Sequence, residues 1–193
     1  MKISPKNTKL GSIPNVSLTP VKACGNCAHC KNDCYALKSY RQYKNVRNSW
    51  DGNFEQAKTD LSGYMTDLYV YLDKKRPRLF RWHVSGDILS HEYLVCMFSI
   101  AKSFPETKFL AFTKMFNLDY SECPKNLSIV FSMWPGQPVP KNTSGVAGFY
   151  WLQDGSETRI PENAIECFGT CDCCGMCWNL RNMEVNHIFN HKH

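Results

Sequence analysis

The fold of this chain is decided by the stretch Leu79-Phe80-Arg81-Trp82-His83-Val84-Ser85-Gly86-Asp87, which reads as a strand that ends in a polar turn. Strand-like apolar runs follow at residues 108–112, 127–131 and 146–151. Helical or looping segments separate these runs. This alternation predicts parallel pairing of the strands in an α/β sheet.

The segments around the first strand are expected to be helical. Apolar spacing predicts one helix over residues 35–48 and another over 54–74, with a break at residues 51–53. Asp51 or Asn53 is the expected cap of the second helix. Beyond the strand, Ser90 is expected to cap a helix that runs to Ser103.

Length and composition indicate one globular domain. The chain has 193 residues and a hydrophobic fraction of 43%, which is enough to build a substantial core. We divide this single α/β domain into four parts: an amino-terminal arm and Cys loop (1–34), a helical part (35–78), a strand-rich core (79–152) and a carboxyl-terminal Cys segment (153–193).

Charge, hydropathy and cysteine content indicate the cellular compartment of the protein. The formal net charge is +6, and the basic residues are spread along the chain without a dense tract. The chain contains no run of eighteen apolar residues, so we expect no membrane span. The first residues lack the apolar core of a signal peptide. We therefore expect a cytoplasmic protein. Its eleven cysteines are bunched, which favours metal or redox chemistry over the alternative of a secreted disulfide framework.

Polar side chains follow the strands of the predicted sheet. Ser85 and Asp87 end the first central strand, Thr113 and Lys114 the second, and Ser132 the third. In parallel α/β folds, sites form at the carboxyl ends of strands. We expect Asp87 and Lys114 to be catalytic, and Ser85, Thr113 and Ser132 to bind a cofactor or substrate. The alternative is that each residue only caps the following turn.

Two thiol-rich segments lie on either side of these strands. The first reads Cys24-x2-Cys27-x2-Cys30-x3-Cys34, and the second contains Cys171-x2-Cys174-x2-Cys177, with Cys167 and Cys173 close by. Three cysteines at spacing two can wrap a 4Fe-4S cluster, and its fourth ligand comes from a distant segment. One candidate arrangement follows from this rule.

In that arrangement, the two segments complete each other's clusters. One cluster is bound by Cys24, Cys27, Cys30 and either Cys167 or Cys173. The other is bound by Cys171, Cys174, Cys177 and Cys34.

Zinc is the competing metal. Two Cys-x2-Cys pairs, one from each segment, would form a structural zinc site, with His29 as a further candidate ligand. Zinc would use only four of the nine clustered thiols, so the surplus favours iron–sulfur clusters. A zinc-stabilised module would use its basic helix on nucleic acid, through Lys38, Arg41, Lys44 and Arg47.

Two other motifs are weaker. The radical-SAM signature Cys-x3-Cys-x2-Cys occurs only at Cys167, Cys171 and Cys174, after the strands and not near the first one. S-adenosylmethionine is therefore a possible cofactor that this position disfavours. His187 and His191 stand close to the end of the chain without a partner motif, and we expect a solvated tail from His191 to His193.

The assembled motifs resemble one protein family. They are Asn7-Thr8-Lys9-Leu10-Gly11, Cys30-x3-Cys34-Tyr35-Ala36, His83-Val84-Ser85-Gly86-Asp87, Ala111-Phe112-Thr113-Lys114, and the terminal Cys171-x2-Cys174-x2-Cys177-Trp178. This set is similar to the phage-encoded "gene product 88" family, which has no assigned molecular function. The resemblance implies a phage source, iron–sulfur binding and a partial, incomplete parallel βα barrel related to that of radical-SAM proteins.

These observations lead to one main expectation. The chain should be an iron–sulfur redox protein or redox enzyme with one or two 4Fe-4S clusters, in the cytoplasm of an infected or lysogenic bacterium. Its partners would be an electron donor or acceptor protein, or a small-molecule substrate, and no membrane. The alternatives are the zinc-stabilised nucleic-acid-binding module and a structural phage protein with a stabilising metal.

Overall fold

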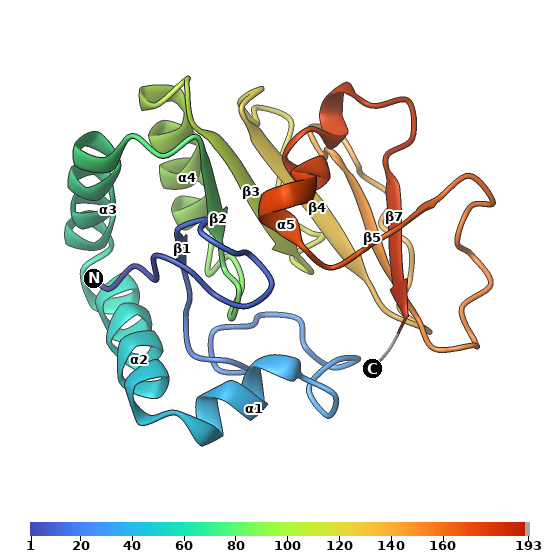
Figure 1. Ribbon diagram of the computed structural model, residues 1–193, viewed down its shortest axis with the longest axis horizontal. Helices are drawn as coiled ribbons and strands as arrows, with labels where there is room; N and C mark the ends of the chain where they lie inside the picture. Colours follow the sequence, from blue (N-terminus) through green and yellow to red (C-terminus); the bar gives the residue numbers. More distant parts are fainter. Residues whose placement is uncertain (192–193) are drawn as a thin grey trace.

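A computed structural model describes residues 1–191 and shows a single parallel sheet of seven strands (Figure 1). The strand order is β1-β2-β3-β4-β5-β7-β6, and every neighbouring pair is parallel. The strands are β1 (Asn15–Val16), β2 (Leu79–Trp82), β3 (Lys108–Thr113), β4 (Leu127–Met133), β5 (Gly148–Gln153), β6 (Ile165–Glu166) and β7 (His187–His191).

The sheet has two buried faces, because both are covered by other parts of the chain. Side chains alternate between them along each strand. The outer face carries Phe80, Trp82, Phe109 and Phe131, and it packs against α3 (Leu61–Lys75) and α4 (His91–Ser103). In Figure 1 these helices lie beside β2 on the left of the molecule.

The inner face is covered by the two ends of the chain. Leu110, Val130 and Ile188 pack there against Leu10 and Ile13 of the amino-terminal arm. They also pack against Trp178 and Leu180, which belong to the short 3-10 helices η1 (Met176–Trp178) and η2 (Leu180–Asn182). The indole Nε1 of Trp178 donates to the Phe80 carbonyl at 3.0 Å, and Ser128 Oγ donates to the Trp178 carbonyl at 3.2 Å.

The predicted parallel α/β fold with Cys-rich segments at both ends is confirmed. The sheet begins at β1 and ends at β6, and these two strands do not pair with each other in the described residues 1–191. An open parallel sheet of this kind is what an incomplete βα barrel requires. The two-residue strands β1 and β6 and the strand β7 were not expected from the apolar pattern.

The predicted break between the first two helices is wrong in position. The helices are α1 (Tyr35–Gln42), α2 (Lys44–Thr59) and α3, so residues 51–53 lie inside α2. The chain breaks at Tyr43 and Asp60 instead. The Asp60 side chain caps α3 by accepting from the Gly63 N–H at 2.9 Å.

Tertiary contacts explain why α2 continues through an Asp-Gly-Asn sequence. Asn53 is buried, and its amide accepts from the Lys2 N–H at 2.6 Å and donates to the carbonyls of Lys2 and Ser17. Asp51 accepts from Thr19 Oγ1 at 2.6 Å and from the Tyr40 hydroxyl at 2.8 Å. These bonds offset the cost of about 1 kcal/mol for a glycine in a helix.

Of the predicted solvated tail from His191 to His193, the structure describes only His191, whose exposed side chain lies at the end of β7. His187 and His191 are the first and last residues of β7, which pairs with β5 and β6. The His187 ring stacks on Phe149 at 4.9 Å between centroids and accepts from Trp151 Nε1 at 3.0 Å. His193 lies outside the described residues.

No helix within residues 1–191 is long and apolar enough to cross a membrane.

Candidate functional site

The loop that carries the first cysteines lies at the carboxyl edge of the sheet. It leaves the end of β1 and is joined to the turn after β2 by backbone hydrogen bonds: Leu18 N–H donates to the Ser85 carbonyl at 2.8 Å, and Asp87 N–H to the Ala23 carbonyl at 2.9 Å. Gly86 allows this close approach. Its φ is +83°, and a Cβ there would lie 2.7 Å from the Leu18 Cβ.

Asp87 joins the ends of β2 and β3. Its buried carboxylate accepts from Thr113 Oγ1 at 2.6 Å and from the Ile88 and Lys114 N–H groups at 2.7 and 2.9 Å. Burial raises the pKa of Asp87, and these hydrogen bonds oppose the shift. Asp87 therefore links the turn after β2 to the end of β3. The catalytic role predicted for it stays a prediction.

The other strand-end residues are divided between different environments. Thr113 is committed to Asp87, whereas the buried Ser85 hydroxyl has no partner in the described residues. Ser132 alternates with Phe131 along β4 and so belongs to the inner face. The Lys114 ammonium lies 5.9 Å from the centre of the Trp134 ring. The structure thus brings Asp87, Thr113 and Lys114 together and leaves Ser132 apart.

Cys24, Cys27, Cys30 and Cys34 form what we call the amino-terminal thiol group. Cys30 interacts electrostatically with both Cys27 and Cys34, and Cys24 with Cys27. Burial raises the pKa of the Cys24 thiol to about 12, with a smaller contribution from Asp87, and the Lys114 charge opposes this rise. All four thiols are reduced. Burial also raises the pKa of the Cys30 thiol, and Lys114 again opposes this rise.

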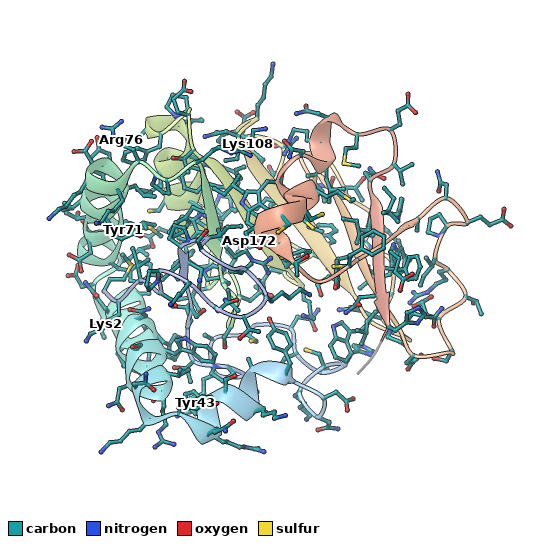
Figure 2. The ribbon with its side chains drawn as sticks, viewed as in Figure 1. Lys2, Tyr43, Tyr71, Arg76, Lys108 and Asp172 are labelled. Carbon is teal, nitrogen blue, oxygen red and sulfur yellow. The ribbon has the colours of Figure 1, made fainter. Side chains whose placement is uncertain are left out.

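Cys167, Cys171, Cys174 and Cys177 form the carboxyl-terminal thiol group. Cys167 directly follows β6, Cys171 and Cys174 lie on α5 (Cys171–Cys174), and Cys177 lies on η1. Cys171 and Cys177 interact electrostatically with each other and with the other two members. The Cys171 N–H donates to the Lys9 carbonyl at 3.0 Å, and the Cys167 N–H to the Phe189 carbonyl at 2.8 Å. The segment is thereby fixed on the inner face. Figure 2 labels Asp172, which lies on α5 in the middle of the molecule.

The thiols of each segment are neighbours of one another. Cys34 interacts with Cys30 of its own segment, and Cys173 is exposed. The predicted exchange of ligands between the segments, through Cys34 and through Cys167 or Cys173, stays a prediction. His29 is exposed on the first Cys loop.

Arg81 is the buried charged residue that sequence reasoning missed. It lies on the inner face of β2 with 8% of its surface exposed, and its guanidinium carbon is 4.0 Å from the centre of the Phe112 ring. Its Nε donates to the Trp82 carbonyl at 3.0 Å, and no carboxylate pairs with it among residues 1–191. The signal was an arginine inside an otherwise apolar strand.

The ionisable neighbours of Arg81 come from the start of α1, from β5 and from the carboxyl-terminal Cys segment. They are Tyr35, Cys177, Cys171 and Tyr150. Burial lowers the pKa of Arg81, and these four groups oppose the shift in decreasing order. The Tyr35 hydroxyl donates to the Val84 carbonyl, and so brings the start of α1 to the end of β2. Burial raises the pKa of Cys177 to about 12, and Arg81 opposes this shift. Arg81 is thus a buried cation that faces uncharged thiols.

The spacing of the thiols bears on the kind of metal. Within residues 1–191, no three Cys, His, Asp or Glu side chains lie close enough together to hold one ion. A zinc ion holds its sulfur ligands at about 2.3 Å, and so draws them close to each other. In a 4Fe-4S cluster each cysteine binds a different iron, and the sulfurs lie farther apart. A cluster and a zinc ion would therefore need different separations of the same cysteine sulfurs.

Comparisons with known proteins point to one family. A family model described as "Gene product 88" matches residues 2–134. The "Gene 88 protein" of Mycobacterium phage D29 is 31% identical over 120 residues, which cover 56% of this chain and 50% of that protein. The chain therefore spans about half the length of that relative. No solved structure matches. The matched residues contain the amino-terminal thiol group and Arg81, whereas the carboxyl-terminal thiol group lies beyond residue 134.

Proposed function

The chain belongs to the gene product 88 family of phage proteins, and from its own residues we propose that it binds 4Fe-4S clusters, one or two per chain, and acts in one-electron redox chemistry. The amino-terminal thiol group would hold one cluster and the carboxyl-terminal thiol group the other. The family name supplies no activity, so the proposal rests on the chemistry of the site.

The unpaired charge of Arg81 carries this proposal. An ion that is buried without a partner costs several kcal/mol, even after the protein relaxes around it. The thiols that face Arg81 cannot offset this cost at neutral pH, because the pKa of Cys177 is about 12 and the pKa of Cys171 is also raised by burial. Thiolates that bind iron are deprotonated at neutral pH. A cluster on the carboxyl-terminal thiol group would therefore give Arg81 the anionic partner that it lacks.

The amino-terminal thiol group has a comparable environment. Burial raises the pKa of Cys24 and Cys30, and the Lys114 charge opposes this rise. The Lys114 backbone is held in place by the bond from its N–H to Asp87 and by the Asn26 amide, which donates to the Lys114 carbonyl at 3.2 Å. When bound, a cluster supplies one-electron transfer at a potential that is set by nearby charges and hydrogen bonds. This chain provides Lys114 and Asp87 beside the amino-terminal thiol group, and Arg81 and Lys9 beside the carboxyl-terminal thiol group.

If the protein is an enzyme, its substrate would contact polar side chains that are not already used in hydrogen bonds within the fold. The Ser85 hydroxyl is buried without a partner, so it can donate to a bound molecule. Lys114 would contribute from the end of β3, whereas the binding role predicted for Ser132, which lies apart on the inner face of β4, stays a prediction. S-adenosylmethionine would be one such molecule, and a small-molecule substrate another.

Metal and sulfide analysis of protein purified without oxygen tests the proposal. We expect four or eight iron atoms per chain with equal acid-labile sulfide, a brown colour, and an electron paramagnetic resonance signal after reduction. Colourless protein with stoichiometric zinc would contradict the proposal and favour the zinc-stabilised nucleic-acid-binding module.

Single cysteine variants assign the clusters. Cys24→Ser should remove the iron of the amino-terminal thiol group, and Cys171→Ser that of the carboxyl-terminal thiol group. Cys96→Ser is the matched control, because Cys96 lies on α4 outside both groups. Cys173→Ser should also retain full iron content, since Cys173 is not among the thiols that interact with Cys171 and Cys177.

A further inference from the structure

An open hollow lies directly beside Cys34. It has a volume of about 680 Å³ and is formed by the end of the first Cys loop and by α1. Lys31, Lys38 and Arg41 line it together with Cys34, two carboxamide side chains and one leucine. One thiol of the amino-terminal group is therefore part of a surface depression.

The hollow is strongly basic. Lys31 comes from the Cys loop, whereas Lys38 and Arg41 are three residues apart on α1 and so lie on neighbouring parts of one helix face. All three side chains are exposed, and no acidic side chain lines the hollow. Three cations around one depression attract a partner with negative charge on its surface.

We propose that this hollow docks an acidic electron-transfer protein, which passes one electron to the amino-terminal thiol group by way of Cys34. This inference rests on the proposed iron–sulfur function. In the step, the reduced flavin or iron–sulfur centre of the partner loses one electron and the cluster gains it. No bond forms or breaks. The partner class is therefore a flavodoxin-like or ferredoxin-like acidic protein.

Two features favour a redox protein over other anionic partners. First, a proposed cluster ligand lines the hollow, so a protein seated there would reach the cluster across a short path. Second, transient redox complexes use small interfaces and depend on charge steering for a fast encounter. A nucleic acid would also be attracted by the cations, but it would have no use for the thiol.

The test compares two triple variants with the same loss of charge. The first is Lys31→Gln, Lys38→Gln and Arg41→Gln in the hollow. The matched control is Lys74→Gln, Lys75→Gln and Arg78→Gln, whose side chains are exposed at the end of α3 and before β2. Reduced flavodoxin is the probe, and stopped-flow absorbance follows its oxidation by the cluster-loaded protein at several salt concentrations.

We expect the hollow variant to transfer electrons at least about tenfold more slowly at low salt, because charge steering raises association rates by 10-fold to 1000-fold. The control variant should stay within about twofold of the wild type. Salt should slow the wild type and hardly affect the hollow variant. Equal effects of the two triple variants would overturn the proposal.

Titration calorimetry measures binding of flavodoxin to metal-free protein, and so tests the docking site without depending on a cluster. This separates the inference from the proposed function. Iron-free protein after anaerobic purification contradicts the iron–sulfur function, whatever flavodoxin does. Cluster-loaded protein that fails to bind flavodoxin contradicts only the docking site. Tight binding of a single-stranded oligonucleotide that displaces flavodoxin, and that the hollow variant loses, would reassign the hollow to nucleic acid and overturn the proposal.

Discussion

Replacement of Arg81 by methionine should change protein stability in opposite directions with and without metal. In metal-free protein, the substitution removes a buried charge that has no carboxylate partner within residues 1–191. In loaded protein, the same substitution removes the proposed partner of the carboxyl-terminal cluster. The sign of the effect therefore reports what Arg81 pairs with.

The structure sets the size of the effect. An unpaired buried ion costs several kcal/mol, which we take as about 5 kcal/mol. Arg81 recovers about 2 kcal/mol from its contact with the Phe112 ring and about 1 kcal/mol from its bond to the Trp82 carbonyl. Arg81→Met should therefore stabilise metal-free protein by about 2 kcal/mol. For a chain of this length, that corresponds to a rise in Tm of about 4–8 °C.

Urea unfolding at pH 7, without oxygen and with a reductant, measures this difference. Arg78→Met is the control, since Arg78 is exposed just before the same strand, and its substitution should change stability by less than about 0.5 kcal/mol. In protein purified without oxygen, Arg81→Met should lower the iron content. If Arg81→Met destabilises the metal-free protein by about 2 kcal/mol and leaves the iron content unchanged, then Arg81 is paired within the metal-free chain and our reasoning is wrong.

Three further substitutions test the site and the fold. Gly86→Ala should lower the free energy of unfolding in urea by about 2–4 kcal/mol, because Gly86 has a positive φ and no space for a Cβ. Gly155→Ala is the control: its φ is +93° but the space around it is open, so the loss should be only about 1 kcal/mol. Equal losses would show that the close approach at Gly86 does not matter. Burial lowers the pKa of His83 to about 3, whereas in the unfolded chain it is about 6.5. Below pH 6.5 the unfolded chain therefore binds a proton that the folded protein does not, and the free energy of unfolding should fall by about 2 kcal/mol at pH 5. His83→Asn should remove this loss, whereas substitution of the exposed His29 should leave it unchanged. Asp60→Ala should cost about 1 kcal/mol through loss of the cap of α3, seen as a lower urea midpoint with an unchanged slope.

The parallel sheet could be predicted from sequence because its central strands are apolar on both faces. The runs at residues 79–84, 108–112, 127–131 and 146–151 contain β2, β3, β4 and β5 to within a few residues. Their carboxyl ends share one edge by topology alone, and this is why Asp87 and Thr113 could be expected to meet.

The rest of the fold depends on contacts between residues that are far apart in the chain. The strand β1 has two residues, and it is defined by its pairing with β2 and not by an apolar pattern. The helix α2 passes through Gly52 because Asn53 bonds to the amino-terminal arm. The helix and strand propensities of single residues do not reveal either the pairing of β1 or the continuation of α2. The inward direction of Arg81 could have been read from the strand alternation, but its missing partner could not.

The shortness of the outermost strands has a consequence for how copies of this protein behave toward each other. An open parallel sheet exposes two rows of backbone N–H and C=O groups, which can recruit strands from other molecules. Here the outermost strands, β1 and β6, have only two residues each. Edges this short present few unpaired groups to another chain. The protein can therefore leave its barrel incomplete, with room for the chain ends on the inner face, without inviting edge-to-edge aggregation.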